Sequence, residues 1–500
     1  MPRPLRGIER PGQVIAWGMY DLANQSFTLL IITLLFSRYV QQVVTPHPPP
    51  PQALSQLQTA DRADADPAAA ALERGETTAA QRAEIEAYID AREKADRRGE
   101  LHWSLMHGGT LLFVVAFSPV AGALADARGW RKRLLVTSGL LCSALTASLA
   151  WVGPGMLWLA VLLYVPANLC FQLGENFLAA FLPQIATPRT IGRVSAIGWT
   201  MGYIGALALL AITAAIIVLG GLGNEAEWPP LFVFAGAWFA LGLTPAALVL
   251  PQDTPSPDDR DGGGLLRLGA RRVGQTLRHA RRYRELMKFL LAFVIYGFGV
   301  QVIIAFASIL AGDFGFQRLD LIVFVAQITV TAGLASGVTG LFQDRIGVRA
   351  TILIYLGIWL ASAGALLAVD IVYPLGGPQW PLWAIGNGLG FALGGIGTAS
   401  RSMVARFAPR HRRAEFFGLW GMTYKLAGAL GVLGFGLIAE LFGRTASLVF
   451  LTSTFGVGLL LMLPVREMAG VRAARRVERS VGLDRAGRRG HDGSRAPATT

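Results

Sequence analysis

The chain has 500 residues, of which 53% are hydrophobic and only 15% are charged, and its mean hydropathy is +0.46. Soluble domains carry about 25% charged residues, so this composition excludes a string of ordinary soluble domains and indicates that much of the surface faces lipid. The two cysteines exclude a disulfide scaffold. The net charge of +13 comes from short cationic clusters between apolar segments, a pattern typical of membrane-protein loops rather than of nucleic-acid binders.

Apolar stretches near or above about 18 residues, the length of a membrane-spanning helix, recur along the whole chain. Twelve are predicted, at residues 14–42, 104–125, 134–152, 156–182, 195–220, 229–250, 287–311, 320–341, 351–369, 380–405, 416–439 and 445–464. The first is too long and too polar for a cleaved signal peptide, so it is interpreted as a span. Cationic clusters lie on alternate loops, which predicts that both termini are cytoplasmic.

The spans divide the chain into segments. We expect a cytoplasmic N-terminus (1–13), a first six-helix half (14–251), a basic cytoplasmic linker (252–286), a second half (287–465) and a basic tail (466–500). The linker suits a helix lying on an anionic inner leaflet. The tail is poor in apolar residues, which predicts disorder.

A polar insert at residues 46–101 interrupts the first half. It opens with a proline run and then contains Thr78 and Gln81, which have the spacing of a helix-starting capping box. A polar helix outside the membrane is therefore expected. A solvated spacer is the favoured interpretation over a partner-binding role.

The loops after spans 2 and 8 repeat one pattern. Its two copies are Gly122, Asp126, Arg128, Gly129 and Arg131, and Gly340, Asp344, Arg345, Gly347 and Arg349. The shared glycines, aspartates and final arginines are offset by 218 residues (340 − 122 and 349 − 131), which predicts two homologous six-helix halves. Glycine permits close helix packing, the aspartate can meet a helix N-terminus, and the arginines face cytoplasmic phosphates.

This repeat resembles the signature loop of the major facilitator superfamily, Gly-x-x-x-Asp-(Arg/Lys)-x-Gly-x-(Arg/Lys), although Ala127 stands where a cation is usual. The resemblance implies an all-α fold of twelve helices in two pseudo-symmetric halves. In that fold, helices 1, 4, 7 and 10 line a central cavity and helix 11 flanks it. It also implies that Asp126 closes the cytoplasmic side by meeting the N-terminus of helix 11 near residues 414–415.

Residues 17–27, WGMYDLANQSF, are similar to the Trp-x-x-Tyr-Asp-x-Ala-Asn-x-x-Phe opening of the vacuole-effluxer-like branch, which includes fungal vacuolar amino-acid permeases. Further similar segments are 175–183, 198–205, 400–404 and 414–419. The chain is thereby identified as a bacterial member of that branch. Related sequences place an acid in helix 7 where this chain has Phe298, so no coupling role is assigned there.

Ionisable and amide side chains at membrane depth are the candidate substrate and coupling residues, because burying them is costly unless they are paired or used. They are Asp21 and Asn24 in span 1, Asn168, Gln172 and Glu175 in span 4, Arg401 in span 10 and Lys425 in span 11. The two acids and the lysine lie at similar depth, which predicts one shared cavity. A protonatable carboxylate coupled to substrate is favoured over a structural ion network, and Arg401 is expected to snorkel or to act at a gate.

No phosphate-binding loop, nucleophile elbow or metal-ligand spacing occurs, and the six histidines avoid the predicted membrane core. We therefore expect no enzyme activity and no cofactor. The predicted function is secondary transport of a small organic solute across the bacterial inner membrane by a monomer, by proton-coupled efflux, with amino acids as the first candidates by resemblance. The alternatives are a membrane sensor or scaffold and, less favoured, a lipid-modifying enzyme.

Overall fold

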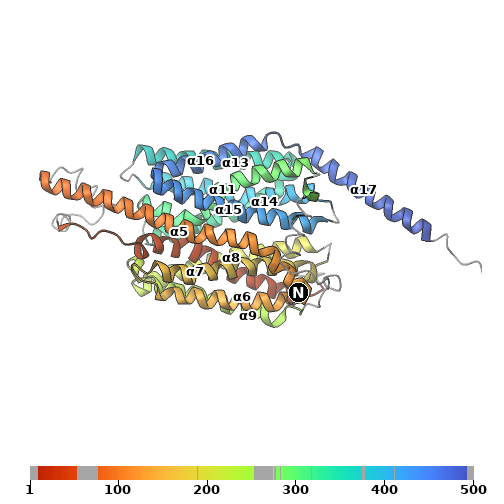
Figure 1. Cartoon of the computed structure of the whole chain (residues 1–500), viewed down its shortest axis with the longest axis horizontal. Helices are drawn as coiled ribbons and strands as arrows, with labels where there is room; N and C mark the ends of the chain where they lie inside the picture. Colours follow the sequence, from red (N-terminus) through yellow and green to blue (C-terminus); the bar gives the residue numbers. More distant parts are fainter. Residues whose placement is uncertain are drawn as a thin grey trace, which may run out of the picture.

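The structure, a computed structural model, describes residues 9–52, 77–187, 190–252, 283–316, 318–373, 378–409 and 412–492, together with Gly274 and residues 278–281. The regular elements in these ranges are all helical. Figure 1 shows long helices lying side by side along one axis, with those of the first half on one side and those of the second half on the other. Most of the predicted linker lies outside the described residues.

The first half contains the α-helices α1 (Pro11–Gln25), α2 (Phe36–Tyr39), α5 (Ala79–Arg128), α6 (Arg131–Ser148), α7 (Leu157–Ile185), α8 (Ile191–Gly220) and α9 (Pro229–Val249). Its shorter or wider turns are η2 (Ser26–Leu34), η3 (Val40–Val44), η4 (Leu149–Trp151) and η5 (Glu225–Glu227). The second half contains α11 (Arg284–Asp313), α12 (Arg318–Ile346), α13 (Val348–Val372), α14 (Trp380–Phe407), α15 (Arg413–Phe442) and α16 (Arg444–Met462), and α17 (Glu467–Asp492) follows. We call the end of the bundle that carries η3 and η5 the insert end, and the end at which α1 begins and α17 leaves the tail end.

The predicted membrane helices are confirmed. Within the described residues, eleven helical segments are long and apolar enough to cross a membrane. The twelfth, α14, has 28 residues but is rich in glycine and carries two arginines. Two of its glycines, Gly390 and Gly394, pack against the backbone of α12, so the glycine stripe serves close helix packing.

Helix α5 joins two segments that the sequence suggested were separate. It runs for 50 residues from the polar insert through span 2, and the predicted capping box between Thr78 and Gln81 is present at its start. Residues 79–104 contain no proline and one glycine, Gly99, so the sequence has no strong helix breaker there. Gly99 lies against the backbone of Gln41, where a larger side chain would not fit. Its first turns extend beyond the insert end of the bundle (Figure 1).

Residues 467–492, part of the tail for which the sequence predicts disorder, form the helix α17 in the structure. This segment is rich in arginine and alanine, which favour helix, and low hydrophobicity alone does not prevent a single helix from forming. Its first residue is also anchored: the Glu467 carboxylate accepts hydrogen bonds from the Arg349 backbone N–H (2.9 Å) and from the Arg406 guanidinium (2.7 Å).

Span 1 changes its helical form where the candidate residues lie. It is α-helical to Gln25 and then π-helical over Ser26–Leu34. A π-helical turn widens the backbone and re-aims the side chains beside it, and such turns are frequent at functional sites. This change directly follows Asp21 and Asn24.

Candidate functional site

The candidate residues from four helices meet midway along the bundle. Glu175 of α7 accepts a short hydrogen bond from the Asn24 side chain of α1. The Lys425 ammonium of α15 donates to the Gln172 side-chain oxygen (2.6 Å) and to the Gln172 backbone oxygen (3.3 Å). The structure therefore brings together the predicted spans 1, 4 and 11, which are α1, α7 and α15, as their matched depths predicted.

Electrostatic interactions join the remaining two charges to this group. Glu175 interacts with Lys425, and Asp21 interacts with both Glu175 and Arg401. Arg401 also lies over the Trp420 ring, with its guanidinium carbon 6.0 Å from the ring centroid. We call Asp21, Glu175, Arg401 and Lys425 the central cluster.

The central cluster is divided by charge. Both acids come from the first half, on α1 and α7, and both cations come from the second half, on α14 and α15. The electrostatic attraction therefore acts across the boundary between the halves. A solute carrying both charge signs would find complementary groups on the two sides.

A polar chain continues from the central cluster toward the insert end. Gln172 donates to Asn168 (3.4 Å), the Asn168 amide lies 3.3 Å from Nδ1 of His107, and the Tyr164 hydroxyl lies 2.7 Å from the same nitrogen. Asn168 and Tyr164 are fully buried and His107 is 5% exposed. The prediction that the histidines avoid the core is wrong for His107, because α5 packs against α7 at this point and buries the imidazole among α7 side chains.

The insert end is closed by a second group of charges that sequence reasoning missed. Arg38 of α2 forms ion pairs with Asp313 of α11 (3.3 Å) and with Glu225 of η5 (3.4 Å). Gln41 accepts from Arg38 (2.8 Å) and donates to Asp313 (3.4 Å). We call Arg38, Asp313 and Glu225 the insert-end cluster; the signal for it was a cation inside the first predicted span.

Backbone-directed bonds reinforce this closure between the halves. The Trp103 indole donates to the Ala305 carbonyl (2.8 Å) and the Ser104 hydroxyl to the Val432 carbonyl (2.9 Å). Ser37 and Ser308 also share a hydrogen bond of 3.0 Å. The first and second halves are therefore held together from the central cluster to the insert end.

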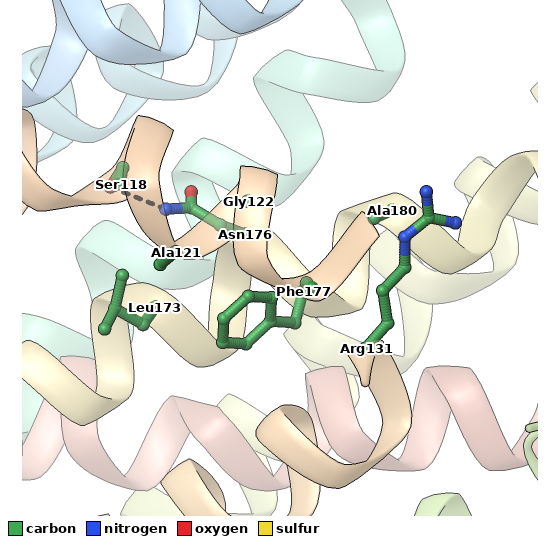
Figure 2. Close-up of a pocket in the computed structure, with 9 residues that line it drawn as sticks. Ser118, Ala121, Gly122, Arg131, Leu173, Asn176, Phe177 and Ala180 are labelled. Atoms are coloured by element: carbon green, nitrogen blue, oxygen red, sulfur yellow. Dashed lines mark hydrogen bonds between the residues drawn. The ribbon is translucent and has the colours of Figure 1, made fainter. Parts of the chain in front are cut away.

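The first copy of the repeated loop surrounds a small pocket at the tail end. Gly122 and Arg131 line a cavity of about 60 Å³ between α5, α6 and α7, where Asn176 donates to Ser118 (2.9 Å; Figure 2). Gly129 has a φ of 65° and ends α5, and the guanidinium carbon of Arg128 lies 4.7 Å from the Trp130 ring centroid. The Asp126 side chain lies outside the described residues, so its gating role stays a prediction.

The second copy makes different contacts. Asp344 pairs with Arg406 of α14 (2.6 Å) rather than with a helix N-terminus. Gly347 has a φ of 90° and precedes α13, so the second glycine of both copies has a positive φ, which glycine adopts without steric cost. The Arg349 guanidinium donates to the Leu463 carbonyl (2.7 Å). Arg345 is exposed, and Gly340 faces open space that could hold a larger side chain. Asp344, through Arg406, and Arg349 therefore connect the second copy to Glu467 at the start of α17.

The profile of the family described as vacuole effluxer Atg22 like matches residues 11–192 and 188–475. The chain belongs to this family. An uncharacterized MFS-type transporter of Bacillus subtilis, YxiO, is 28% identical over 370 residues, covering 71% of this chain and 82% of the relative. Autophagy-related protein 22 of Kluyveromyces lactis is 23% identical over 376 residues, covering 70% and 75%.

Solved structures share the fold. A D-xylose-proton symporter superposes with a TM-score of 0.63 at 13% identity, over 92% of this chain and 98% of that one. The nucleoside transporter NupG gives a TM-score of 0.58 at 14% identity, over 91% and 99%. The protein is a multi-pass transporter of the major facilitator type, with relatives that are transporters rather than enzymes.

Proposed function

We propose that this transporter exports a small, amino-acid-like solute in exchange for protons, and that the central cluster is its binding and coupling site. The division of charge carries the proposal: Asp21 and Glu175 on the first half face Arg401 and Lys425 on the second. An α-amino acid presents an ammonium to carboxylates and a carboxylate to cations. A bound amino acid would thus replace the direct attraction between the acids and the cations by its own contacts with both.

The closed insert end supports alternating access around this site. The insert-end cluster and the Trp103 and Ser104 bonds hold that end shut, so solute would reach the central cluster from the tail end. Export then requires the insert-end contacts to break after solute binds. Binding can drive that step only through an interaction that differs between the two states, and the shared charges supply one.

Proton coupling is proposed for Asp21 or Glu175, because a carboxylate can change charge while its partners keep theirs. The test begins with metabolite profiles of cells lacking and overproducing the protein, to choose the solute for proteoliposomes. Asp21→Asn and Glu175→Gln preserve size and most hydrogen bonding while removing titration. One of them should abolish accumulation driven by a pH gradient yet leave solute counterflow intact.

Normal pH-driven accumulation by both variants would overturn the coupling assignment. Loss of counterflow as well as accumulation in both would instead favour a purely structural ion network. A cell phenotype that survives these variants but is lost on trimming residues 46–101 and 466–500 would favour the sensor or scaffold alternative. The matched control is Asp90→Asn on the exposed part of α5, where the acid pairs with Lys94.

We also propose that both termini lie in the cytoplasm of a bacterial cell and that the protein is a monomer, since one chain supplies every group of the central cluster. Cationic loops on the tail-end side support this orientation. Single cysteines at Ser55 and Ser256, in a background lacking Cys142 and Cys170, should react oppositely with an impermeant thiol reagent. Labelling of Ser256→Cys from outside intact cells would overturn the orientation.

A further inference from the structure

The hydrogen-bond partner of Lys425 is the Gln172 side-chain amide, which has an oxygen that accepts and an NH₂ group that donates. Lys425 approaches the Gln172 oxygen at 2.6 Å. If the Gln172 amide were rotated by half a turn, its NH₂ group would face the ammonium, and two donors would oppose each other. The ammonium therefore favours one direction of the amide, and a fixed acceptor at the other end of the polar chain would reinforce that direction.

That direction can be followed through the polar chain one bond at a time. Gln172 points its NH₂ at the Asn168 oxygen (3.4 Å), which leaves its own oxygen for Lys425. Asn168 in turn points its NH₂ at Nδ1 of His107 (3.3 Å). In this direction of the Asn168 amide, Nδ1 is the acceptor and carries no proton, so the imidazole is the neutral tautomer with its proton on Nε2, and the Tyr164 hydroxyl shares the same lone pair.

The surroundings make His107 a fixed end for this chain. The Tyr164 hydroxyl lies 2.7 Å from Nδ1, and the Trp103 ring stacks on the imidazole with centroids 5.4 Å apart. Trp103 is itself tied to the second half through Ala305. Tyr164, Asn168 and Gln172 follow each other at intervals of four residues, so they lie along one face of α7.

We infer that His107 is a positioning residue of the central cluster. The lone pair on its Nδ1 sets the donor-to-acceptor direction of Asn168 and Gln172. The Gln172 oxygen then accepts a hydrogen bond from the Lys425 ammonium, in competition with Glu175. His107 acts through two amides and touches neither Lys425 nor the solute. The inference rests on the proposed function only in treating Lys425 as a transport-site residue.

Lysine is rare enough in this chain to give a direct measurement. The four lysines are Lys94, Lys132, Lys288 and Lys425. Full-length protein labelled with [ε-¹³C]lysine and placed in lipid nanodiscs should give four ε-methylene NMR signals, and Lys425→Arg assigns the one from the site. The position of that signal reports the bonds of the ammonium without any need for the solute.

His107→Leu removes the acceptor and should displace the Lys425 signal, while His107→Asn keeps a side-chain acceptor close to the position of Nδ1 and should restore it. Asn168→Ala breaks the next link and should displace the signal in the same way. The other three lysine signals serve as the fold control. If His107→Leu disturbs them, Asn168→Ala decides the question in its place.

An unmoved Lys425 signal in a folded His107→Leu or Asn168→Ala protein would overturn the inference. So would an equal displacement in His107→Asn, because a role in packing alone is not rescued by an acceptor. These outcomes are separate from those for transport. Loss of proton-driven accumulation concerns Asp21 and Glu175, whereas the Lys425 signal concerns only the direction of the amide chain.

Discussion

The central cluster and the insert-end cluster both place charges between the two halves, but they treat those charges differently. At the insert end, Arg38 bonds directly to Asp313 and Glu225, and the Arg38 and Asp313 side chains are each 10% exposed. In the centre, Glu175 and Lys425 take the neutral amides of Asn24 and Gln172 as hydrogen-bond partners. The difference suggests that insert-end charges are committed to closure, whereas central charges remain able to exchange partners.

Removing the arginine of the insert-end cluster should give the largest effect, because this cluster is expected to hold the insert end closed. Arg38→Ala removes the cation that is bonded to both acids and leaves Asp313 with only a longer-range attraction to a cation, Arg444, which should cost the closed arrangement about 3 kcal/mol, at the low end of the cost for buried pairs that lose one member. Ser308→Cys, in the cysteine-free background, should then react much faster with a thiol reagent, because the insert end opens.

Arg82→Ala is the matched control. Arg82 also pairs with an acid, Glu86, near the insert end, but their side chains are 60% and 59% exposed, so its loss should change little. Equal reactivity of Ser308→Cys with and without Arg38 would show that the insert-end cluster is not what holds this end shut.

Removing the lysine of the central cluster should have a smaller effect on stability. Lys425→Met leaves the Gln172 oxygen and Glu175 without their cation, at a cost of about 1–3 kcal/mol in the free energy of unfolding. Adding Glu175→Gln should recover part of this loss, since the uncompensated charge is then gone. Unfolding curves in detergent measure both steps.

The comparison between the clusters would fail if Lys425→Met cost as much as Arg38→Ala, or if the double variant were less stable than the single one. Either result would mean that the central charges form a committed ion network like the one at the insert end.

A third group of ion pairs lies at the tail end and should contribute least, because it includes the most exposed side chains of the three. Arg406 is 36% exposed and binds both Asp344 and Glu467. Glu467→Gln should loosen the start of α17 by about 1 kcal/mol and speed its cleavage by trypsin near Arg472, with little change in the bundle. The control, Arg479→Gln, changes an exposed residue further along α17; cleavage near Arg472 accelerated equally by both variants would contradict the anchoring role.

The amino-acid sequence predicted the spans, the two halves and the depth of the central acids, because each depends on local periodicity or on spacing along one chain. Asp21 and Asn24 share a helical face, and Glu175 lies at a similar depth in span 4. The pairing of Arg38 with Asp313 depends on how two helices cross, which no local pattern records. The same is true of the burial of His107 in α5 and of the π-helical turns after Gln25.

The length of α5 has a mechanical consequence. Its first turns extend beyond the insert end of the bundle (Figure 1), while Asp96 is bonded to Gln42 and His47 of the same half. This stretch of α5 therefore projects from a base that is bonded to the first half. Residues 79–95 span roughly 26 Å, so a tilt of about 10° would sweep the tip through roughly 5 Å. A fluorophore at the tip would report each rocking motion optically, far from the solute and without touching it.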